Sequence, residues 1–322
     1  MRTMRSLFLL GLALAARTTA AQTIPWPAPE LRIVDSVRVD AKKAQINGRD
    51  LAMALRVDGS IAILGAGPEL FLLDSIGRLK WKRKLWPDMR YPNAISWRGD
   101  SVFVIDNAAD QILAVGSNGG IGDLIDFPDY VRPTFRNRRS LAAYGAFDVV
   151  AIVDSTLVGT GRRPRRMGMY GPNTKADPSV LPVLRANVDG IVQVHLATVV
   201  NASKGDVWSI LPDGRVTIFR TDKDSLAFIG ISPRGDTTFS RHLSKVRAVF
   251  GNAVGSNDGT IWVSTSMGGN EFYHTAFDAR GIPLGRLRLA NYLRVMAGDA
   301  RHIWVVDTRG QSRSITRYTV QR

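Results

Sequence analysis

An apolar, strand-like segment recurs six times in this sequence, and this repeat limits the possible folds more than any other feature. Successive copies start 41, 47, 58, 54 and 42 residues apart, and a Gly/Asp pair precedes most of them. The copies begin at Ser60, Ser101, Asp148, Asp206, Thr260 and His302. Glycine and aspartate favour tight hairpin turns, so the period predicts an array of small antiparallel units rather than one large sheet.

Each unit contains more than the shared segment. In the first copy, residues 70–74 form another apolar stretch, a turn follows at 75–77, and residues 79–85 form a further strand. With one strand before the shared segment, each unit is a four-stranded antiparallel meander, which is the blade of a β-propeller. The shared segment is expected to be the second strand from the axis. The predicted blades span 49–85, 93–127, 140–196, 201–243, 248–289 and 292–320.

The last unit lacks a fourth strand, and residues 31–39 can supply it. This pairing closes the ring and removes its exposed edges. The predicted fold is therefore all-β: a six-bladed β-propeller of four-stranded antiparallel blades, closed by an N-terminal strand that completes the last blade. A transmembrane barrel is the alternative, but its strands would be about ten residues long and would alternate cleanly. The shared segments are short and apolar on both faces.

The second unit resembles the NHL-repeat consensus. Tyr91-Pro92 precedes an apolar strand, Gly99-Asp100 forms the turn, and the next strand ends in Asp106-Asn107. The fifth unit, with Asp258-Gly259 before its strand, is similar. The resemblance covers nearly the whole chain after its N-terminal segment and implies an exported six-bladed propeller of the NHL-repeat group. It implies little about activity, because propellers carry many functions.

Residues 1–21 have the features of a signal peptide: a basic start, an apolar run of ten at 7–16, and small residues before Gln22, the expected first mature residue. A run of ten is too short to span a bilayer. Residues 22–30 form a Pro-rich tether, and 31–322 form a single propeller domain. No later stretch has the length of a transmembrane segment, so the sequence predicts export to a periplasm or to the extracellular space.

The chain carries 43 basic and 28 acidic side chains, which gives a formal charge of +15. Most of the basic residues are arginine, which binds carboxylates and phosphates through a two-pronged guanidinium group. A GC-rich genome also produces arginine-rich proteins, so only the placement of the arginines bears on function. The chain has no cysteine, which excludes disulfides, thiol nucleophiles and cysteine-ligated metal sites.

Two arginine-dense connections, 128–139 and 162–170, are expected on one face of the ring. This looped face carries the connections between blades and those between the second and third strands of a blade. The arginines predict an electropositive funnel that attracts anions; the alternative is solvated loops without a ligand. The predicted ligand-binding residues are Arg90, Tyr91, Arg132, Arg136, Arg138, Arg139, Arg162, Arg163, Arg165, Arg166 and Tyr170. The expected partner is an anionic ligand, an envelope polymer or a protein, and not a nucleic acid.

Three aspartates at the ends of shared segments are also expected on the looped face: Asp106, Asp154 and Asp307. Carboxylates are suitable ligands for Ca²⁺ or another divalent ion. Aspartates at strand ends also accept hydrogen bonds within their own turns, and this role is the alternative. Propeller lactonases surround such an ion with Glu, Asn and Asp, whereas Glu69 and Glu271 here lack the surrounding motif. No other cofactor is expected.

The four histidines fall on different predicted blades, and each is expected to be an ordinary strand residue rather than a base. No catalytic residue can be assigned. Three functions therefore stay open: a module that binds an anionic partner on its looped face, a metal-dependent lactonase-like hydrolase or lyase with its site at the channel mouth, and a scaffold without a small ligand. A salt-sensitive interaction without metal favours the first function, and a divalent ion favours the second.

Overall fold

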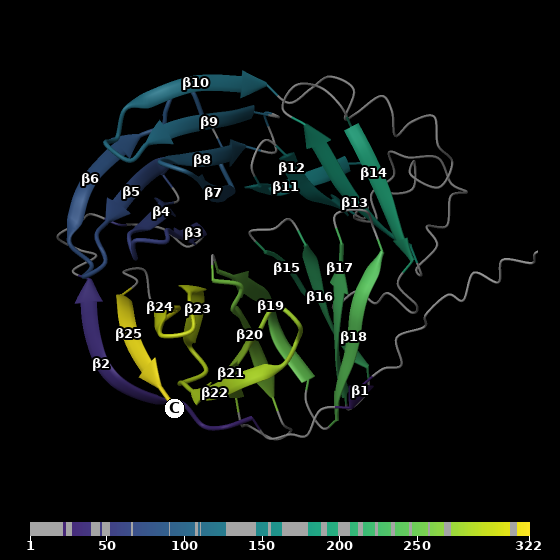
Figure 1. Ribbon diagram of the computed structural model, residues 1–322. Coiled ribbons are helices and arrows are strands. Elements are labelled where there is room, and N and C mark those ends of the chain that lie inside the picture. The colour runs from purple at the N-terminus through teal and green to yellow at the C-terminus, as the bar shows by residue number, and fades with distance from the viewer. Residues whose placement is uncertain are drawn as a thin grey trace, which may run out of the picture.

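In the computed structural model the chain folds as antiparallel sheets arranged around a central axis (Figure 1). The residues described are 22–23, 28–39, 46, 52–65, 67–89, 91–106, 109, 111–126, 146–153, 156–162, 180–187, 192–198, 207–211, 215–222, 225–232, 236–244, 247–256, 258–266, 272–309 and 314–322. These residues contain no helix long and apolar enough to cross a membrane.

The described strands form six sheets, and the first three come from residues 52–198. The first sheet contains β3 (Ala52–Leu55), β4 (Ile61–Gly65), β5 (Glu69–Leu73) and β6 (Leu79–Lys84). The second contains β7 (Ala94–Arg98), β8 (Ser101–Asp106), β9 (Gln111–Gly116) and β10 (Ile121–Asp126). The third contains β11 (Ala146–Val153), β12 (Thr156–Arg162), β13 (Val180–Asn187) and β14 (Val192–Thr198).

The other three sheets follow in the second half. The fourth contains β15 (Val207–Ile210), β16 (Val216–Asp222), β17 (Ser225–Ile231) and β18 (Thr237–Ser244). The fifth contains β19 (Arg247–Gly255), β20 (Ile261–Ser266), β21 (Phe272–Phe277) and β22 (Pro283–Arg288). The sixth contains β23 (Leu293–Gly298), β24 (His302–Asp307) and β25 (Ile315–Gln321). These sheets are the blades of a β-propeller, as the repeat predicted.

The sixth sheet receives its fourth strand from near the other end of the chain. Strand β2 (Arg32–Val39) pairs antiparallel with β25, from Arg32 opposite Gln321 to Val39 opposite Ile315. The predicted pairing of residues 31–39 with the last unit is therefore present. Figure 1 shows β2 outside β25, at the rim of the ring.

The segment before β2 runs along the outer edges of two further sheets. Strand β1 (Gln22–Thr23) pairs parallel with β18, so the fourth sheet has five strands. At β22, Leu31 N donates to Arg286 O at 2.8 Å, and Arg286 N donates to Pro29 O at 2.8 Å. The segment predicted as a tether is thus bound to β18 and to β22 before it enters the sixth sheet.

Turns in the first and fifth sheets repeat the same geometry. Gly59 and Gly259 both adopt a positive φ, at 81° and 82°, between the first and second strands. The aspartate before each glycine accepts a backbone hydrogen bond at 2.9 Å, from Ser60 N in one turn and from Thr260 N in the other. The Gly/Asp pairs read from the sequence therefore form the predicted turns.

Apolar side chains pack between neighbouring sheets, where tryptophans also join one blade to the next. Trp97 Nε1 in the second sheet donates to Ala54 O in the first at 2.9 Å. Trp262 Nε1 in the fifth sheet donates to Asp299 O beside the sixth, also at 2.9 Å. Burial of these large aromatic groups at the contacts contributes strongly to the stability of the ring. These two tryptophans therefore join neighbouring blades.

The strand order in the third and fourth sheets differs from the prediction. The shared segments at 148–154 and 206–211 were expected to be second strands, but β11 and β15 are the innermost strands of their sheets. The prediction is wrong there because Val149–Val153 is the most continuous apolar run of its unit, whereas β12 contains two glycines and two threonines. Continuous hydrophobicity normally indicates the doubly buried second strand.

Candidate functional site

The two kinds of connection expected on the looped face do lie together. In the second sheet, Asn93 N, before β7, donates to Ile105 O near the end of β8 at 2.9 Å. In the sixth sheet, Thr308 N, after β24, donates to Tyr292 O before β23 at 2.8 Å. A connection between blades thus contacts the end of a second strand in both places, and this contact defines the looped face in the structure.

Of the predicted basic funnel, the structure describes only a small part. Tyr91 is 73% exposed beside the second sheet. Arg162 is the last residue of β12. The other predicted ligand-binding residues, Arg90, Arg132, Arg136, Arg138, Arg139, Arg163, Arg165, Arg166 and Tyr170, lie outside the described residues. The funnel over the second and third blades stays a prediction.

Asp106, a predicted metal ligand, is fully buried at the end of β8. Its Oδ2 accepts a hydrogen bond from Tyr91 N at 2.8 Å, and its Oδ1 accepts one from Ala109 N at 3.0 Å. The carboxylate therefore joins the connection before β7 to the loop after β8, and it fixes the backbone of the exposed Tyr91.

Asp307 occupies the corresponding position at the end of β24 and binds an arginine. Its Oδ2 accepts a hydrogen bond from Arg309 Nη2 at 2.8 Å, and its Oδ1 accepts one from Arg309 N at 2.9 Å. The Arg309 guanidinium beside Asp307 holds the pKa of that carboxyl below its usual value. The same guanidinium lies 3.3 Å from the centre of the Tyr292 ring. Asp307 thus orients a cation on the looped face.

Asp154, the third predicted metal ligand, lies outside the described residues. The strand before it, β11, is innermost in its sheet, so Asp154 does not follow a second strand as Asp106 and Asp307 do. Within the described ranges, no group of three or more histidine, aspartate and glutamate side chains is placed to hold a metal ion. The metal site stays a prediction.

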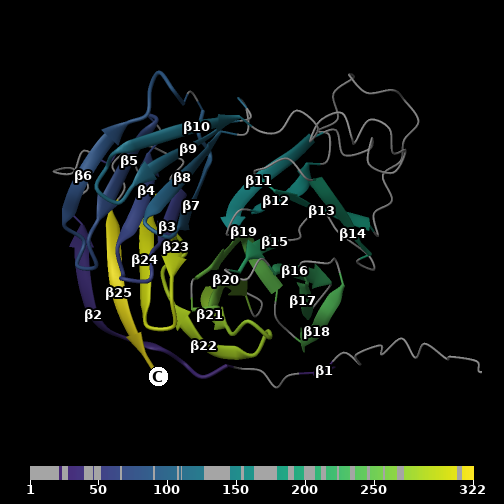
Figure 2. The same ribbon diagram turned by 45° about the horizontal axis from the view of Figure 1, so that its top comes forward.

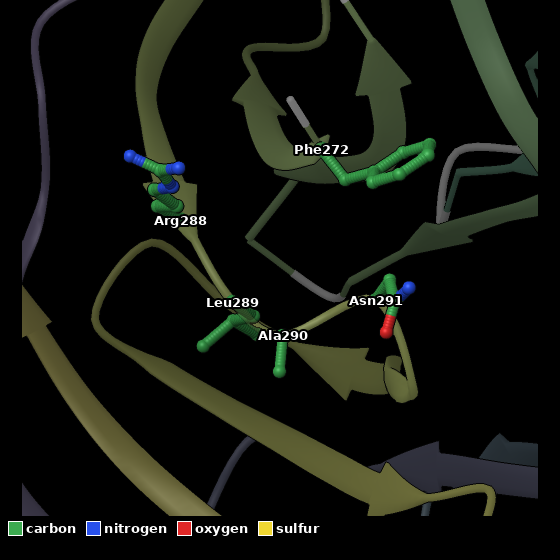
Figure 3. A pocket seen from close by; sticks show the side chains of 5 residues that line it. All are labelled: Phe272, Arg288, Leu289, Ala290 and Asn291. Carbon is green, nitrogen blue, oxygen red and sulfur yellow. The ribbon is translucent and has the colours of Figure 1, made fainter. Parts of the chain in front are cut away.

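A cavity opens on the looped face between the fifth and sixth sheets (Figure 3). Its volume is about 370 Å³, and it is lined by Phe272, Arg288, Leu289, Ala290 and Asn291. Phe272 begins β21, Arg288 ends β22, and the other three residues connect β22 to β23. Figure 3 shows the Phe272 ring and the Asn291 side chain on the same side of the cavity, away from Arg288.

The wall of this cavity is anchored by a buried histidine two residues after Phe272. His274 Nδ1 lies 3.1 Å from Ser264 Oγ, and its Nε2 lies 3.2 Å from Leu293 O. A neutral ring with its proton on Nε2 satisfies both contacts, because the carbonyl accepts and the hydroxyl donates. Burial lowers the pKa of His274 from 6.5 to about 4, against a smaller opposite effect of the hydrogen bond with Leu293 O. The neutral ring joins β20 and β21 to β23.

The predicted position of the four histidines in strands is confirmed, whereas the cavity was not predicted. His195, His242, His274 and His302 all lie in strands. The cavity depends on residues from two strands and one connection, and these are ordinary residue types without a motif. Phe272 at the start of β21 and Arg288 at the end of β22 are the features of the sequence that point to it.

Comparisons with known proteins support the fold alone. No protein-family model matches the chain, and no curated protein matches it in sequence. A member of the DUF4221 family from Bacteroides vulgatus is similar in structure at 10% identity with a TM-score of 0.54, over 92% of this chain and 99% of that one. A virginiamycin B lyase from Staphylococcus aureus is similar at 12% identity with a TM-score of 0.52, over 90% and 99%. These similar structures are β-propellers.

Proposed function

We propose that the protein is an exported β-propeller that binds an anionic ligand on its looped face, in the cavity beside Arg288. The observation that carries the proposal is the composition of this cavity. Arg288 is exposed and forms no ion pair with a described residue. None of the five lining residues in the described part of the chain is acidic. A cation that lines a concave site and forms no ion pair with a described carboxylate favours an anion.

The other lining groups support a small ligand. Phe272 offers an aromatic surface and Asn291 offers both hydrogen-bond donors and an acceptor. A volume of about 370 Å³ lies within the usual range for small-molecule sites. Arg309, held by Asp307, is stacked on Tyr292, the residue that follows Asn291, and adds a second cation on the same face. The formal charge of +15 for the whole chain acts in the same direction, and it stays strongly positive without the three arginines of residues 1–21.

Export is part of the proposal and rests on residues 1–21, which have the composition of a signal peptide. Strand β1 begins at Gln22, the residue that would come first after cleavage. The mass of the chain recovered from the exporting cell tests this point. The proposal expects a chain that begins at Gln22, and a chain that keeps residues 1–21 contradicts export with cleavage.

Thermal unfolding with phosphate, citrate, glucuronate and phenyl phosphate tests the binding site. A ligand at a hundred times its Kd adds about 2.7 kcal/mol to the free energy of unfolding, which raises the midpoint measurably. We expect a rise with at least one of these anions that weakens with salt and is lost in Arg288→Ala. Arg301→Ala removes an equally exposed cation from the turn between β23 and β24 and serves as the matched control.

Two outcomes of this experiment contradict the proposal. Equal midpoint shifts in the Arg288→Ala and Arg301→Ala variants would place any anion elsewhere on the protein. A rise with calcium that EDTA reverses, with no response to any anion, would favour the metal-dependent alternative and direct attention to Asp106 and Asp307.

A further inference from the structure

Strand β6, at the outer rim of the first sheet, carries an unusual density of cations. Its sequence, Leu-Lys-Trp-Lys-Arg-Lys, has four basic residues in six and no acidic one. Strand β6 is an edge strand, and within the described residues no other strand pairs with its outer side. Figures 1 and 2 both show β6 on the perimeter of the ring.

Two of the four cations are used inside the protein. Lys82 Nζ lies 2.9 Å from Glu69 Oε1 and 5.2 Å from the centre of the Phe71 ring. Arg83 Nε donates to Gly119 O in the second sheet at 2.6 Å. These two side chains contribute to packing within the first sheet and to its contact with the second.

The other two cations face solvent. Lys80 and Lys84 are exposed, and neither forms an ion pair with a described residue, although the charge of Lys80 acts on the Asp58 carboxylate in the turn between β3 and β4. Two positive charges on one open strand attract any anionic surface that approaches this rim.

Large apolar side chains stand at both ends of the same strand. Leu79, its first residue, is 43% exposed, and Trp86, two residues after its end, is 60% exposed. Lysines on an edge strand also prevent unwanted strand pairing, which accounts for their charge. That role does not account for an exposed tryptophan and leucine on either side of them.

The charge and the apolar groups together indicate one class of partner. A soluble polyanion would use the lysines but would gain little from Leu79. The interface of a bilayer accepts both, because anionic headgroups attract lysine while tryptophan and leucine enter the boundary of the acyl chains.

Neighbouring outer strands differ from β6 in charge. Strand β2 of the sixth sheet carries Arg32 and Arg38 with the exposed Ile33 and Val34, but it also carries the acidic Asp35. Strand β10 of the second sheet carries Asp123 and Asp126 and no basic residue. Strand β18 is paired with β1, and β22 is bound by the segment around Glu30. The density of cations without an acidic residue therefore distinguishes β6 from these strands, whereas exposed apolar groups beside cations also occur on β2.

We propose that Lys80, Lys84, Leu79 and Trp86 form a surface that adsorbs to bilayers containing anionic lipid. The surface lies on the rim of the ring and is separate from the cavity at Arg288. Loss of one lysine at an anionic membrane should weaken binding about fivefold.

Co-sedimentation of the purified chain with vesicles tests this proposal. The two preparations are phosphatidylcholine alone and phosphatidylcholine with about one third phosphatidylglycerol, at about 0.1 M and about 1 M salt. We expect binding to the anionic vesicles at low salt and little binding to the others. The Lys80→Ala/Lys84→Ala double variant should bind about 25-fold more weakly, and Trp86→Ala should also bind more weakly.

Controls separate this surface from the rest of the molecule. The Arg301→Ala/Arg322→Ala double variant also removes two positive charges, but from exposed positions outside β6. It should bind the vesicles nearly as well as the original chain. Arg288→Ala should also leave vesicle binding unchanged, so a failure of the anion-binding proposal can be distinguished from a failure of this one. A melting curve for each variant confirms that it is folded.

Several results would overturn the proposal. One is the absence of binding to anionic vesicles by the folded chain at low salt. Another is an equal loss in the Lys80/Lys84 variant and in its control, since binding would then follow net charge alone. A third is binding of heparin that depends on Lys80 and Lys84 but not on Trp86, without binding to vesicles, which would assign the surface to a soluble polyanion.

Discussion

Lys82 in β6 of the first sheet and Arg286 in β22 of the fifth sheet occupy the same position in the repeat, eight residues after the turn aspartate. Lys82 binds a carboxylate from its own sheet, Glu69, at 2.9 Å. Arg286 binds Glu30 of the N-terminal segment at 3.2 Å. These two outer strands therefore share a cation at this position, and the surrounding sequence decides which carboxylate it meets.

The preceding position explains why the N-terminal segment binds one strand and not the other. In β22 this residue is Gly285, and an added Cβ would lie 2.5 Å from Leu31 Cδ2. In β6 it is Trp81, whose Nε1 donates to Ser117 O of the second sheet at 2.8 Å. The glycine leaves room for a side chain from another segment, whereas the tryptophan fills that space itself. In these two outer strands, the residue at this position thus differs between the strand that contacts the N-terminal segment and the strand that does not.

The largest expected difference between the two sheets concerns their equivalent turn glycines. Gly281 and Gly77 have φ values of 77° and 80°, so alanine is strained at both positions. A Cβ at Gly281 would overlap the Phe228 ring, while at Gly77 it would lie 3.1 Å from Val39 Cγ2. We expect Gly77→Ala to lower the free energy of unfolding by about 1–2 kcal/mol and Gly281→Ala by about 4 kcal/mol. Urea unfolding measures both, and equal losses would show that backbone strain alone decides the cost.

A pH titration of stability should also distinguish the sheets. His274 stands four residues before its turn aspartate, where the first sheet has the buried Leu70. The folded pKa of His274 is about 4, below the unfolded value of 6.5, so its contribution is complete above pH 6.5 and is lost as the pH falls towards 4. The loss should approach 3 kcal/mol, at about 1.4 kcal/mol for each pH unit.

The variant His274→Leu, which copies the first sheet, isolates this effect. Its free energy of unfolding should fall less steeply between pH 7 and pH 4 than that of the original chain, whatever its absolute stability. Chemical unfolding at several pH values gives both curves. Identical slopes would mean that His274 takes up no additional proton on unfolding.

The smallest difference is expected between two leucines: Leu31, which lies beside β22, and Leu79, which lies on the unpaired outer edge of β6. Leu31 packs against the apolar cluster between the fifth and sixth sheets, whereas Leu79 is 43% exposed on β6. Leu31→Ala should lower the free energy of unfolding by about 1–2 kcal/mol, and Leu79→Ala by less than about 0.5 kcal/mol. Similar losses would indicate that the N-terminal segment contributes no more than ordinary surface packing.

Much of the fold could be predicted because the repeat carries its signals in local residues. Turn glycines and aspartates gave sheet limits within a few residues, from 52–84 against 49–85 in the first sheet to 247–288 against 248–289 in the fifth. The strand order in the third and fourth sheets could not be predicted in this way. A hydrophobic run shows that a strand is buried, but it does not show how many strands separate it from the axis.

The candidate site was less predictable because it depends on contacts between distant segments. Asp106 and Asp307 were recognised as strand-end carboxylates, but their partners, Tyr91 N and Arg309, depend on how the loops fold back. The docking of Leu31 beside Gly285 joins residues more than 250 positions apart. A single sequence gives no pattern for such a contact.

The pairing of β2 with β25 has a consequence for the order of folding. Val39 and Ile315 are partners, so β2 can pair only after the chain has been extended by the 276 residues that separate them. At about 5–20 residues per second, this interval is roughly 15–55 seconds. The earlier blades can form meanwhile, but the backbone groups of β2 that pair with β25 stay without that partner. A chain truncated before β25 lacks this pairing altogether. The pairing of β2 with β25 therefore follows the synthesis of β25.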